Sequence, residues 1–234
     1  MKKIAVFVEG QTEQFFIEHL LDQVAGTKSI AIEKRQAYGG QTTKRKLKLI
    51  QAAATNSDHK YYAQIVDCGS DNRVKSDVVD NYEGLVRQGF EAIIAVRDVY
   101  PEFTHAEIPK LRNGLRHRVK TEPVEVTFIL GVMEIETWFI SEATHFERMD
   151  TSLTVTRIRT ELGFDPGADD IQLRARPAAD LHNIYRLAGL AYNKSRNNVQ
   201  RTVSVLDYAR IYVELGSRIP DLGLLKEAID LFLA

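Results

Sequence analysis

The opening stretch of the chain constrains its fold more than any other part of the sequence. Residues 4–8 are five consecutive apolar side chains, IAVFV, and the polar run EGQTE follows directly at residues 9–13. A continuous apolar run rich in β-branched and aromatic residues is typical of a strand that is buried on both faces inside a parallel sheet. Glu9 then lies where this strand ends, at the carboxyl edge of the sheet, where open α/β folds bind their ligands.

A helix is predicted after the first strand, and strands and helices then alternate along the chain. Apolar residues recur at helical spacing in 16–24, which predicts that the polar residues between them face outward: Glu13, Gln14, Glu18 and Asp22. Further apolar runs predict strands at 30–33, 61–66, 92–96 and 124–130, with helices at 44–54, 78–86 and 105–119. This alternation predicts an α/β fold with a mainly parallel, Rossmann-like sheet that has helices on both faces.

The pattern changes beyond about residue 141, where no further apolar strand run appears. Apolar residues recur at helical spacing in 199–206 and in 222–232, where Asp221 follows Pro220 in the position of a helix cap. We therefore expect an α/β domain over residues 1–145 and a C-terminal helical extension, packed on it, over residues 146–234.

Composition excludes several classes of protein. The chain has 234 residues, 44% hydrophobic and 27% charged, which is the ordinary range of globular proteins. Its net charge of -1 gives no overall attraction to nucleic acid or to an anionic membrane, so such binding would have to come from local clusters of basic residues. A single cysteine, Cys68, excludes an internal disulfide framework, and no apolar stretch is long enough to span a membrane. We expect a soluble cytoplasmic protein that does not contact membranes.

Acidic residues follow four of the predicted strands. Because parallel strands end at the same edge of a sheet, these carboxylates should lie close together, and five of them are candidate metal ligands: Glu9, Asp67, Asp98, Glu134 and Glu136. Several neighbouring carboxylates need a compensating positive charge, and Mg²⁺ or Mn²⁺ would supply it while polarising a phosphate for attack by water. Acidic residues are also common after strands as helix caps and turn residues, which is the alternative at each position.

Short motifs in the same regions resemble the Toprim superfamily of topoisomerases, primases and OLD-type nucleases. In that superfamily a glutamate closes the first strand and an Asp-x-Asp motif closes a later one, and residues 8–13 and 97–98 match in part. Together with EIETW at 134–138 and YNK at 192–194, the set is similar to a family of stand-alone, Toprim-related bacterial proteins of unknown function. Those proteins are often paired with OLD- or ABC-type ATPases in suspected phage-defence loci. The resemblance implies a Toprim-like fold, an ATPase partner and a role in antiviral defence.

The resemblance also implies roles for individual residues. Glu9 would be the Toprim glutamate, which binds metal or acts as a general acid or base, and Asp98 would be the first aspartate of the Asp-x-Asp motif. Tyr100 stands in place of the second aspartate, and a phenol is a poor magnesium ligand. Three options follow: Glu136 or Asp67 completes the site, one metal suffices, or the catalytic function has been lost. In the first option the catalytic residues are Glu9, Asp98 and Glu136.

Two groups of basic residues are candidates for binding phosphate. The denser group contains Lys34, Arg35, Lys44, Arg45, Lys46 and Lys48. If residues 44–54 form a helix, its amino end follows Gly39 and Gly40 and could bind a phosphate through backbone amides and the charge of Lys44. In the helical extension, Lys194 matches the Tyr-x-Lys of the similar family and is the preferred phosphate contact. A solvated helix face is the alternative explanation for the first group.

Three functions are compatible with these features. The leading hypothesis is a nuclease that depends on Mg²⁺ or Mn²⁺ and hydrolyses DNA or RNA. The second is a catalytically degenerate Toprim-fold module that binds and regulates an ATPase, which the tyrosine at position 100 and the near-zero net charge favour. The third is a phosphohydrolase or phosphotransferase for small molecules. The sequence leaves the oligomeric state open.

Overall fold

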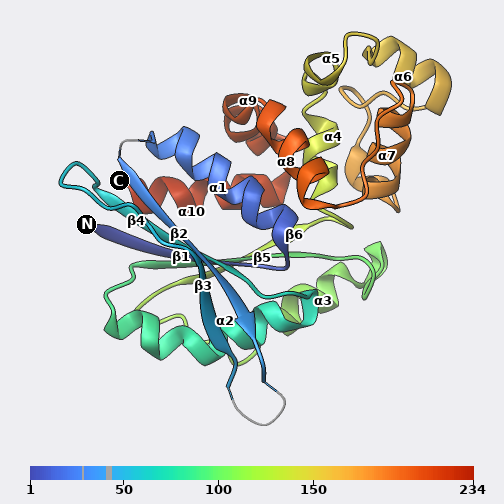
Figure 1. Ribbon diagram of the computed structural model, residues 1–234. Helices are drawn as coiled ribbons and strands as arrows, with labels where there is room; N and C mark the ends of the chain where they lie inside the picture. The colour runs from blue at the N-terminus through green and yellow to red at the C-terminus, as the bar shows by residue number, and fades with distance from the viewer. Residues whose placement is uncertain (28, 41–43) are drawn as a thin grey trace.

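The computed structural model describes residues 1–27, 29–40 and 44–234, and these residues form one six-stranded sheet (Figure 1). The strands lie in the order β3-β2-β4-β1-β5-β6, and all neighbouring pairs are parallel except β2 and β3. Their bounds are β1 Lys2–Val8, β2 Ile30–Tyr38, β3 Lys46–Gln51, β4 Tyr61–Asp67, β5 Ala92–Asp98 and β6 Val126–Gly131. The predicted α/β fold with a mainly parallel sheet is confirmed.

Strand β1 is the centre of the sheet, paired on one side with β4 and on the other with β5. The residues of its apolar run, Ile4–Val8, are at most 1% exposed. Ile4, Val6 and Val8 pack into the larger apolar core on one face, and Ala5 and Phe7 pack into a second core on the opposite face. The prediction of a strand buried on both faces is confirmed, because side chains alternate between the faces of a strand.

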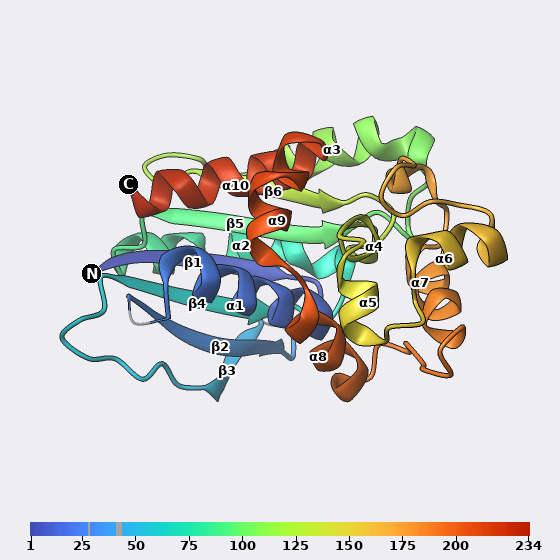
Figure 2. The same cartoon turned by 90° about the horizontal axis from the view of Figure 1, so that it is seen from above.

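Helices cover both faces of the sheet (Figure 1). On one face lie α1 (Gln11–Ala25) and α10 (Pro220–Leu233), and on the other lie α2 (Asp71–Arg87) and α3 (Ile108–Arg116). The remaining helices are α4 Glu136–Ser141, α5 His145–Met149, α6 Val155–Leu162, α7 Pro177–Arg186, α8 Arg196–Val205 and α9 Tyr208–Val213, with short 3₁₀ turns η1 His105–Glu107, η2 Ile171–Leu173 and η3 Leu215–Ser217. Helices α4 to α8 lie beyond the carboxyl edge of the sheet (Figure 2).

The C-terminal helices share the core of the sheet. Helices α8 and α9 contact α1, and α10 contacts β5 and β6. Apolar residues of the sheet and of these helices belong to one buried cluster, in which Phe16 of α1 contacts the rings of Trp138, Phe139 and Tyr208. No helix in the described ranges has the length and apolar character needed to cross a bilayer.

The helix predicted at residues 44–54 is wrong. Residues Lys46–Gln51 form β3 instead, which pairs antiparallel with β2. Leu47 packs against the core beneath α2, while Lys46 and Lys48 are exposed on the other face, so the side chains alternate with the period of a strand. Part of the glycine-bearing turn predicted at 37–43 lies outside the described residues, and Gly39 and Gly40 lie at the end of β2, both with positive φ.

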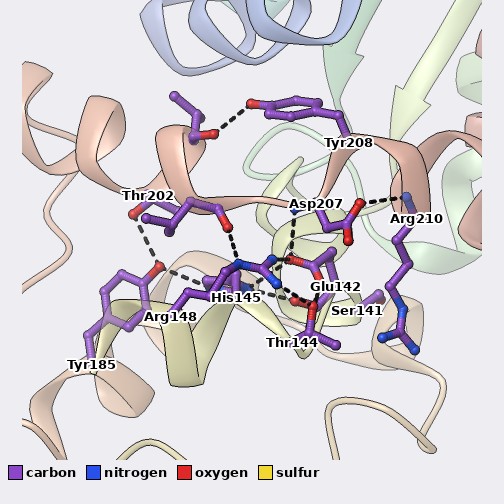
Figure 3. Close-up of polar contacts among 12 residues, drawn as sticks. Ser141, Glu142, Thr144, His145, Arg148, Tyr185, Thr202, Asp207, Tyr208 and Arg210 are labelled. Atoms are coloured by element: carbon purple, nitrogen blue, oxygen red, sulfur yellow. Dashed lines mark hydrogen bonds and ion pairs between the residues drawn. The ribbon is translucent and has the colours of Figure 1, made fainter. Parts of the chain in front are cut away.

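A buried carboxylate ties the C-terminal helices together (Figure 3). Glu142, between α4 and α5, is fully buried. Its Oε1 accepts hydrogen bonds from the backbone N and the hydroxyl of Thr144. Its Oε2 accepts from Arg148 NH2 at 2.9 Å and from the backbone N of Asp207, which precedes α9, at 3.2 Å. One side chain therefore fixes α5 against the start of α9.

The same network continues into α7 and α8 through a buried histidine (Figure 3). His145 Nδ1 lies 2.7 Å from the carbonyl oxygen of Glu142, and His145 Nε2 lies 3.0 Å from the hydroxyl oxygen of Tyr185. Tyr185 in turn donates to the hydroxyl of Thr202 on α8 at 3.2 Å. Burial lowers the pKa of His145 to about 4, so the imidazole is neutral at physiological pH. These contacts position the helices that face the carboxyl edge.

Candidate active site at the carboxyl edge of the sheet

Glu9 and Asp98 meet at the carboxyl edge because their strands are neighbours. Glu9 follows the last residue of β1, and Asp98 is the last residue of β5. The Glu9 Oε2 atom accepts a hydrogen bond from the backbone N of Asp98 at 3.0 Å. Two acidic residues that are 89 positions apart in the sequence therefore meet at this edge, as the parallel strands predict, and the charge of Glu9 acts on the Asp98 carboxylate.

Glu13 also belongs to this site, and the prediction that it faces outward is wrong. It lies in the first turn of α1, where its Oε2 accepts a hydrogen bond from the backbone N of Gly10 at 2.9 Å. The side chain is 3% exposed. The neighbouring Gln14, also predicted outward, is buried and donates to the carbonyl oxygens of Arg35 and Ile65 at 3.1 and 3.2 Å. An acid at the third position of a helix commonly turns back to cap it, which is the sequence signal that marks Glu13.

Asp98 is held by the backbone of the segment after β6. Its Oδ1 accepts a hydrogen bond from the backbone N of Ile135 at 2.8 Å, and the residue is 1% exposed. Gly131, the last residue of β6, leaves room for this contact. A β-carbon at that position would collide with Asp98 Oδ1 and lie 2.9 Å from the Ile135 backbone N. The absence of a side chain at Gly131 therefore allows the aspartate to occupy its place.

Glu134 and Glu136 approach the same place from the turn between β6 and α4. Lys194 Nζ lies 3.3 Å from Glu134 Oε1 and 3.2 Å from Glu136 Oε2. The Tyr192 hydroxyl donates to Glu136 Oε1 at 2.6 Å. Glu134 Oε2 accepts from the backbone N of Ala178, the second residue of α7. The YNK motif of the loop before α8 thus contacts the acids of the EIETW motif directly.

We call Glu9, Glu13, Asp98, Glu134 and Glu136 the acid cluster. Burial and the charges of Glu13 and Asp71 raise the pKa of Glu9 to about 9. Burial likewise raises the pKa of Glu13 to about 7, with Lys194 opposing the shift. Burial and the charges of Glu13 and Glu9 raise the pKa of Asp98 well above its usual range. The cluster therefore holds protons at neutral pH that exposed carboxylates would have lost.

Lys194 is the cation that four of these carboxylates share, all except Glu9. Burial by itself lowers the pKa of this lysine, but the charges of Glu136, Asp98, Glu13 and Glu134 outweigh burial and raise it above its usual value. The backbone of Lys194 has φ of 55°, a left-handed conformation that side-chain-bearing residues seldom adopt. This conformation is used to bring the ammonium group to the acid cluster.

The acid cluster fits a hard divalent cation in charge and in donor chemistry. Carboxylate oxygens are the ligands that Mg²⁺ and Mn²⁺ prefer. Oε2 of Glu136 is buried and, among the described residues, has no hydrogen-bond donor; its ion pair with Lys194 at 3.2 Å is the contact that a metal would replace. Within those residues, however, no three His, Cys, Asp or Glu side chains are already arranged around one metal position. Ligand distances would be reached only by movement of side chains.

Asp67 has other partners than the acid cluster. Its Oδ1 accepts a hydrogen bond from the backbone N of Gly69 at 2.8 Å. Burial raises the pKa of Asp67 above its usual value, although Gly69, Gln36 and Arg45 partly oppose this shift. Arg45 itself is bound to Asp77 at 2.6 Å. Asp67 ends β4, next to β2, and its hydrogen bonds are made there. Glu9 and Asp98 meet on the other side, where β1 and β5 are neighbours.

The predicted phosphate site at Gly39, Gly40 and Lys44 loses its basis, because no helix begins there. Residues Gly39 and Gly40 follow β2 in a hairpin, and the Arg45 side chain packs over Gly40. Lys44 Nζ donates to the carbonyl oxygen of Asp80 on α2 at 3.3 Å. The second predicted phosphate contact, Lys194, lies within the acid cluster.

Tyr100 follows Asp98 by two residues, just beyond the end of β5, and is partly buried. Its backbone N donates to the carbonyl oxygen of Met133 at 2.8 Å. The guanidinium carbon of Arg176 lies 4.6 Å from the centre of its ring, a cation–π contact. The phenol ring therefore packs against the residue that precedes α7.

Comparison with known proteins places few limits on this chain. No protein-family model matches it, and no curated protein matches it. It is similar to a hypothetical protein from Pyrococcus horikoshii OT3 whose crystal structure is known. The two share 15% sequence identity over 98% of this chain and 100% of the other, with a TM-score of 0.49. A similarity of this size carries no argument about function, so fold and site rest on the residues of the chain itself.

Proposed function

We propose that the protein is a divalent-metal-dependent phosphodiesterase that hydrolyses nucleic acid, with a Toprim-like arrangement of its active site. The observation that supports it is that the charges of Glu9, Glu13 and Glu136 all act on the buried Asp98. Lys194 is the cation shared by Glu13, Asp98 and Glu136. Such an excess of buried carboxylate is costly for a fold and is relieved when a cation binds. The resemblance of the EGQTE, EIETW and YNK motifs to Toprim-related proteins points to the same chemistry.

The metal would be held by Glu9, Asp98 and Glu136 and would polarise a phosphate and activate water. Hydrogen bonds from the Asp98 backbone N and from Ile135 N orient Glu9 and Asp98. The Tyr192 hydroxyl orients Glu136. Each of these donors fixes one oxygen of its carboxylate, and the second oxygen of Glu136 faces the Lys194 ammonium.

Lys194 has a second part in this proposal. Its ammonium group lies between Glu134 and Glu136, so it would be repelled from there if Glu136 held a metal. The side chain is 40% exposed and can turn toward solvent. A lysine displaced in this way would be available to bind a phosphate oxygen of the substrate as a point charge.

Incubation of the purified protein with plasmid DNA and with transfer RNA, in Mg²⁺ or Mn²⁺, tests the proposal. We expect metal-dependent cleavage that Glu9→Gln reduces by on the order of 100-fold or more, because the substitution removes a metal ligand or general acid. Glu91→Gln is the matched control, since Glu91 is exposed at the opposite edge of the sheet, and it should leave cleavage unchanged. Cleavage that is absent with either metal, or that Glu9→Gln does not alter, contradicts the proposal.

A second candidate is a regulatory module that binds an ATPase and has lost catalysis. The observation that favours it is the packing of Tyr100 under Arg176, which fills with an aromatic ring the position where the Toprim pattern has a metal ligand. This candidate expects no heat of Mg²⁺ binding in calorimetry. It also expects that an ATPase partner still co-purifies after Glu9 and Asp98 are replaced by Gln and Asn.

A further inference from the structure

The hairpin of β2 and β3 carries an exposed face that the proposed chemistry does not use. This hairpin projects beyond the other strands (Figure 1). Tyr38 pairs with Lys46 and Gln36 pairs with Lys48 across the two strands, so these four side chains share one face. All four are exposed, and Tyr38 is 51% exposed. The opposite face, with Ala37 and Leu47, packs on the core beneath α2.

Basic side chains continue from this face toward the acid cluster. Lys34, two residues before Gln36 on β2, lies with its Nζ 5.2 Å from the ring centre of Phe15 on α1. The guanidinium carbon of Arg196 lies 5.3 Å from the centre of the same ring. Arg196 is the first residue of α8 and follows Lys194 by two positions. We call Tyr38, Lys46, Lys48 and Arg196 the basic strip.

The charges of the basic strip are available to a partner. Lys34 is neutralised by Glu18, at 2.7 Å, and Arg35 by Glu33. Over the described residues, Lys46, Lys48 and Arg196 have no acidic partner within ion-pair distance. An exposed strand face with cations beside an aromatic ring is complementary to a polyanion that carries flat bases.

We propose that the basic strip binds single-stranded nucleic acid and leads it to the acid cluster. Lys46, Lys48 and Arg196 would contact phosphates, and the ring of Tyr38 would stack on a base. A base in a duplex cannot reach that ring, because it is already stacked and paired. This inference rests on the proposed function and names its substrate class.

The position of the strip fits delivery to the site. Gln36 is level with Asp67 in the sheet, and Asp67 is level with Val8, so Tyr38 lies two residues beyond the carboxyl edge that Glu9 shares. One strand, β4, separates β2 from β1, which places them about 10 Å apart. A single strand lying on Tyr38 therefore needs only a few nucleotides to reach the acid cluster past Arg196.

Fluorescence anisotropy in EDTA tests the binding step separately from hydrolysis. The probes are oligothymidylate and oligouridylate of about 20 nucleotides, longer than the roughly 4–16 nucleotides that one small single-strand site covers, and a duplex of equal length. We expect the full-length protein to bind both single strands at least tenfold more tightly than the duplex. Tyr38→Ala should weaken single-strand binding by about tenfold through loss of stacking.

The double variant Lys46→Gln, Lys48→Gln should reduce the slope of log affinity against log salt by about 1.4, since each phosphate contact on a single strand contributes about 0.7. The control, Lys60→Gln with Lys110→Gln, removes two exposed lysines that lie at the amino edge of β4 and on α3, and should leave the slope unchanged. Circular dichroism and thermal melting establish that each variant is folded.

The inference is overturned if the strip and control variants bind the probes equally, if the duplex binds as tightly as the single strands, or if no probe binds. It is also overturned if the strip variants change only the oligomeric state, because the face is then an interface between copies of the chain. Failure of the proposed hydrolysis would give a different result, because the unaltered protein would then bind the single strands in EDTA but would not cleave them with either metal. Glu9→Gln should lose cleavage and still bind the single strands in EDTA as the unaltered protein does.

Discussion

Gly131 is the residue on which the position of Asp98 depends. A β-carbon there would collide with Asp98 Oδ1 and press on the Ile135 backbone N, whose hydrogen bond holds the carboxylate. We predict that Gly131→Ala lowers the free energy of unfolding by about 1–3 kcal/mol, the usual cost of overpacking a buried site. Metal binding should weaken as well, because the aspartate is displaced. Urea unfolding followed by circular dichroism measures the first effect.

Gly114 provides the matched control for that substitution. It lies within α3, and an added β-carbon would meet no atom within 4 Å. Gly114→Ala should therefore raise the free energy of unfolding by about 0.5–1 kcal/mol, because alanine favours the helix over glycine. Equal effects of the two substitutions would contradict the role given to Gly131.

The raised pKa of Glu9 makes stability depend on pH. The folded protein holds the Glu9 proton up to a pKa of about 9, whereas the unfolded chain loses it near 4.5. Between these values the folded state binds more protons, so the free energy of unfolding decreases as pH rises. Glu9→Gln should remove the part of this decrease that Glu9 causes. Urea unfolding from pH 5 to pH 9 measures it, and parallel profiles for the two proteins would refute the assignment.

At the scale of secondary-structure elements, the Glu142 network joins α5 to α9 (Figure 3). Its two carboxylate oxygens accept hydrogen bonds from four donors, two on each oxygen. A glutamine side chain has only one oxygen acceptor, and its NH₂ group would face two of these donors. We predict that Glu142→Gln lowers the free energy of unfolding by about 1.5–3 kcal/mol, the cost of losing a charged hydrogen bond in the interior. Differential scanning calorimetry gives the change.

Glu147→Gln is the control for the network, since Glu147 is exposed on the same short helix α5. It should change the free energy of unfolding by less than about 0.5 kcal/mol. If Glu142→Gln is as mild as this control, the network does not hold the C-terminal helices in place.

The hairpin of β2 and β3 shows where local patterns mislead at this scale. Residues 44–54 are rich in lysine, leucine and alanine, which favour a helix in isolation. In the folded chain β2 extends to Tyr38 and offers its edge to Lys46, and Leu47 gains a place in the core beneath α2. Pairing and burial outweigh a propensity of a few tenths of a kcal/mol per residue.

At the scale of the whole molecule, the sequence predicts the central strands of the sheet well because they are buried on both faces. Continuous apolar runs mark β1 and β5, and their parallel pairing alone brings Glu9 to Asp98. The inward turn of Glu13 is harder to predict, since the spacing of apolar residues in α1 places it on the polar face. The charge of Lys194, from a loop 181 positions later, acts on this buried carboxylate, and local patterns do not reveal that contact.

Anomalous scattering from a crystal soaked in Mn²⁺ tests most directly whether the acid cluster binds a divalent metal. We predict an anomalous peak bounded by the carboxylates of Glu9, Asp98 and Glu136, with Lys194 turned away from Glu136. In a crystal of Glu9→Gln the peak should weaken or vanish, while a Glu91→Gln crystal should retain it. A Mn²⁺ soak that leaves no peak at the acid cluster, or that gives a peak only elsewhere, would contradict the account.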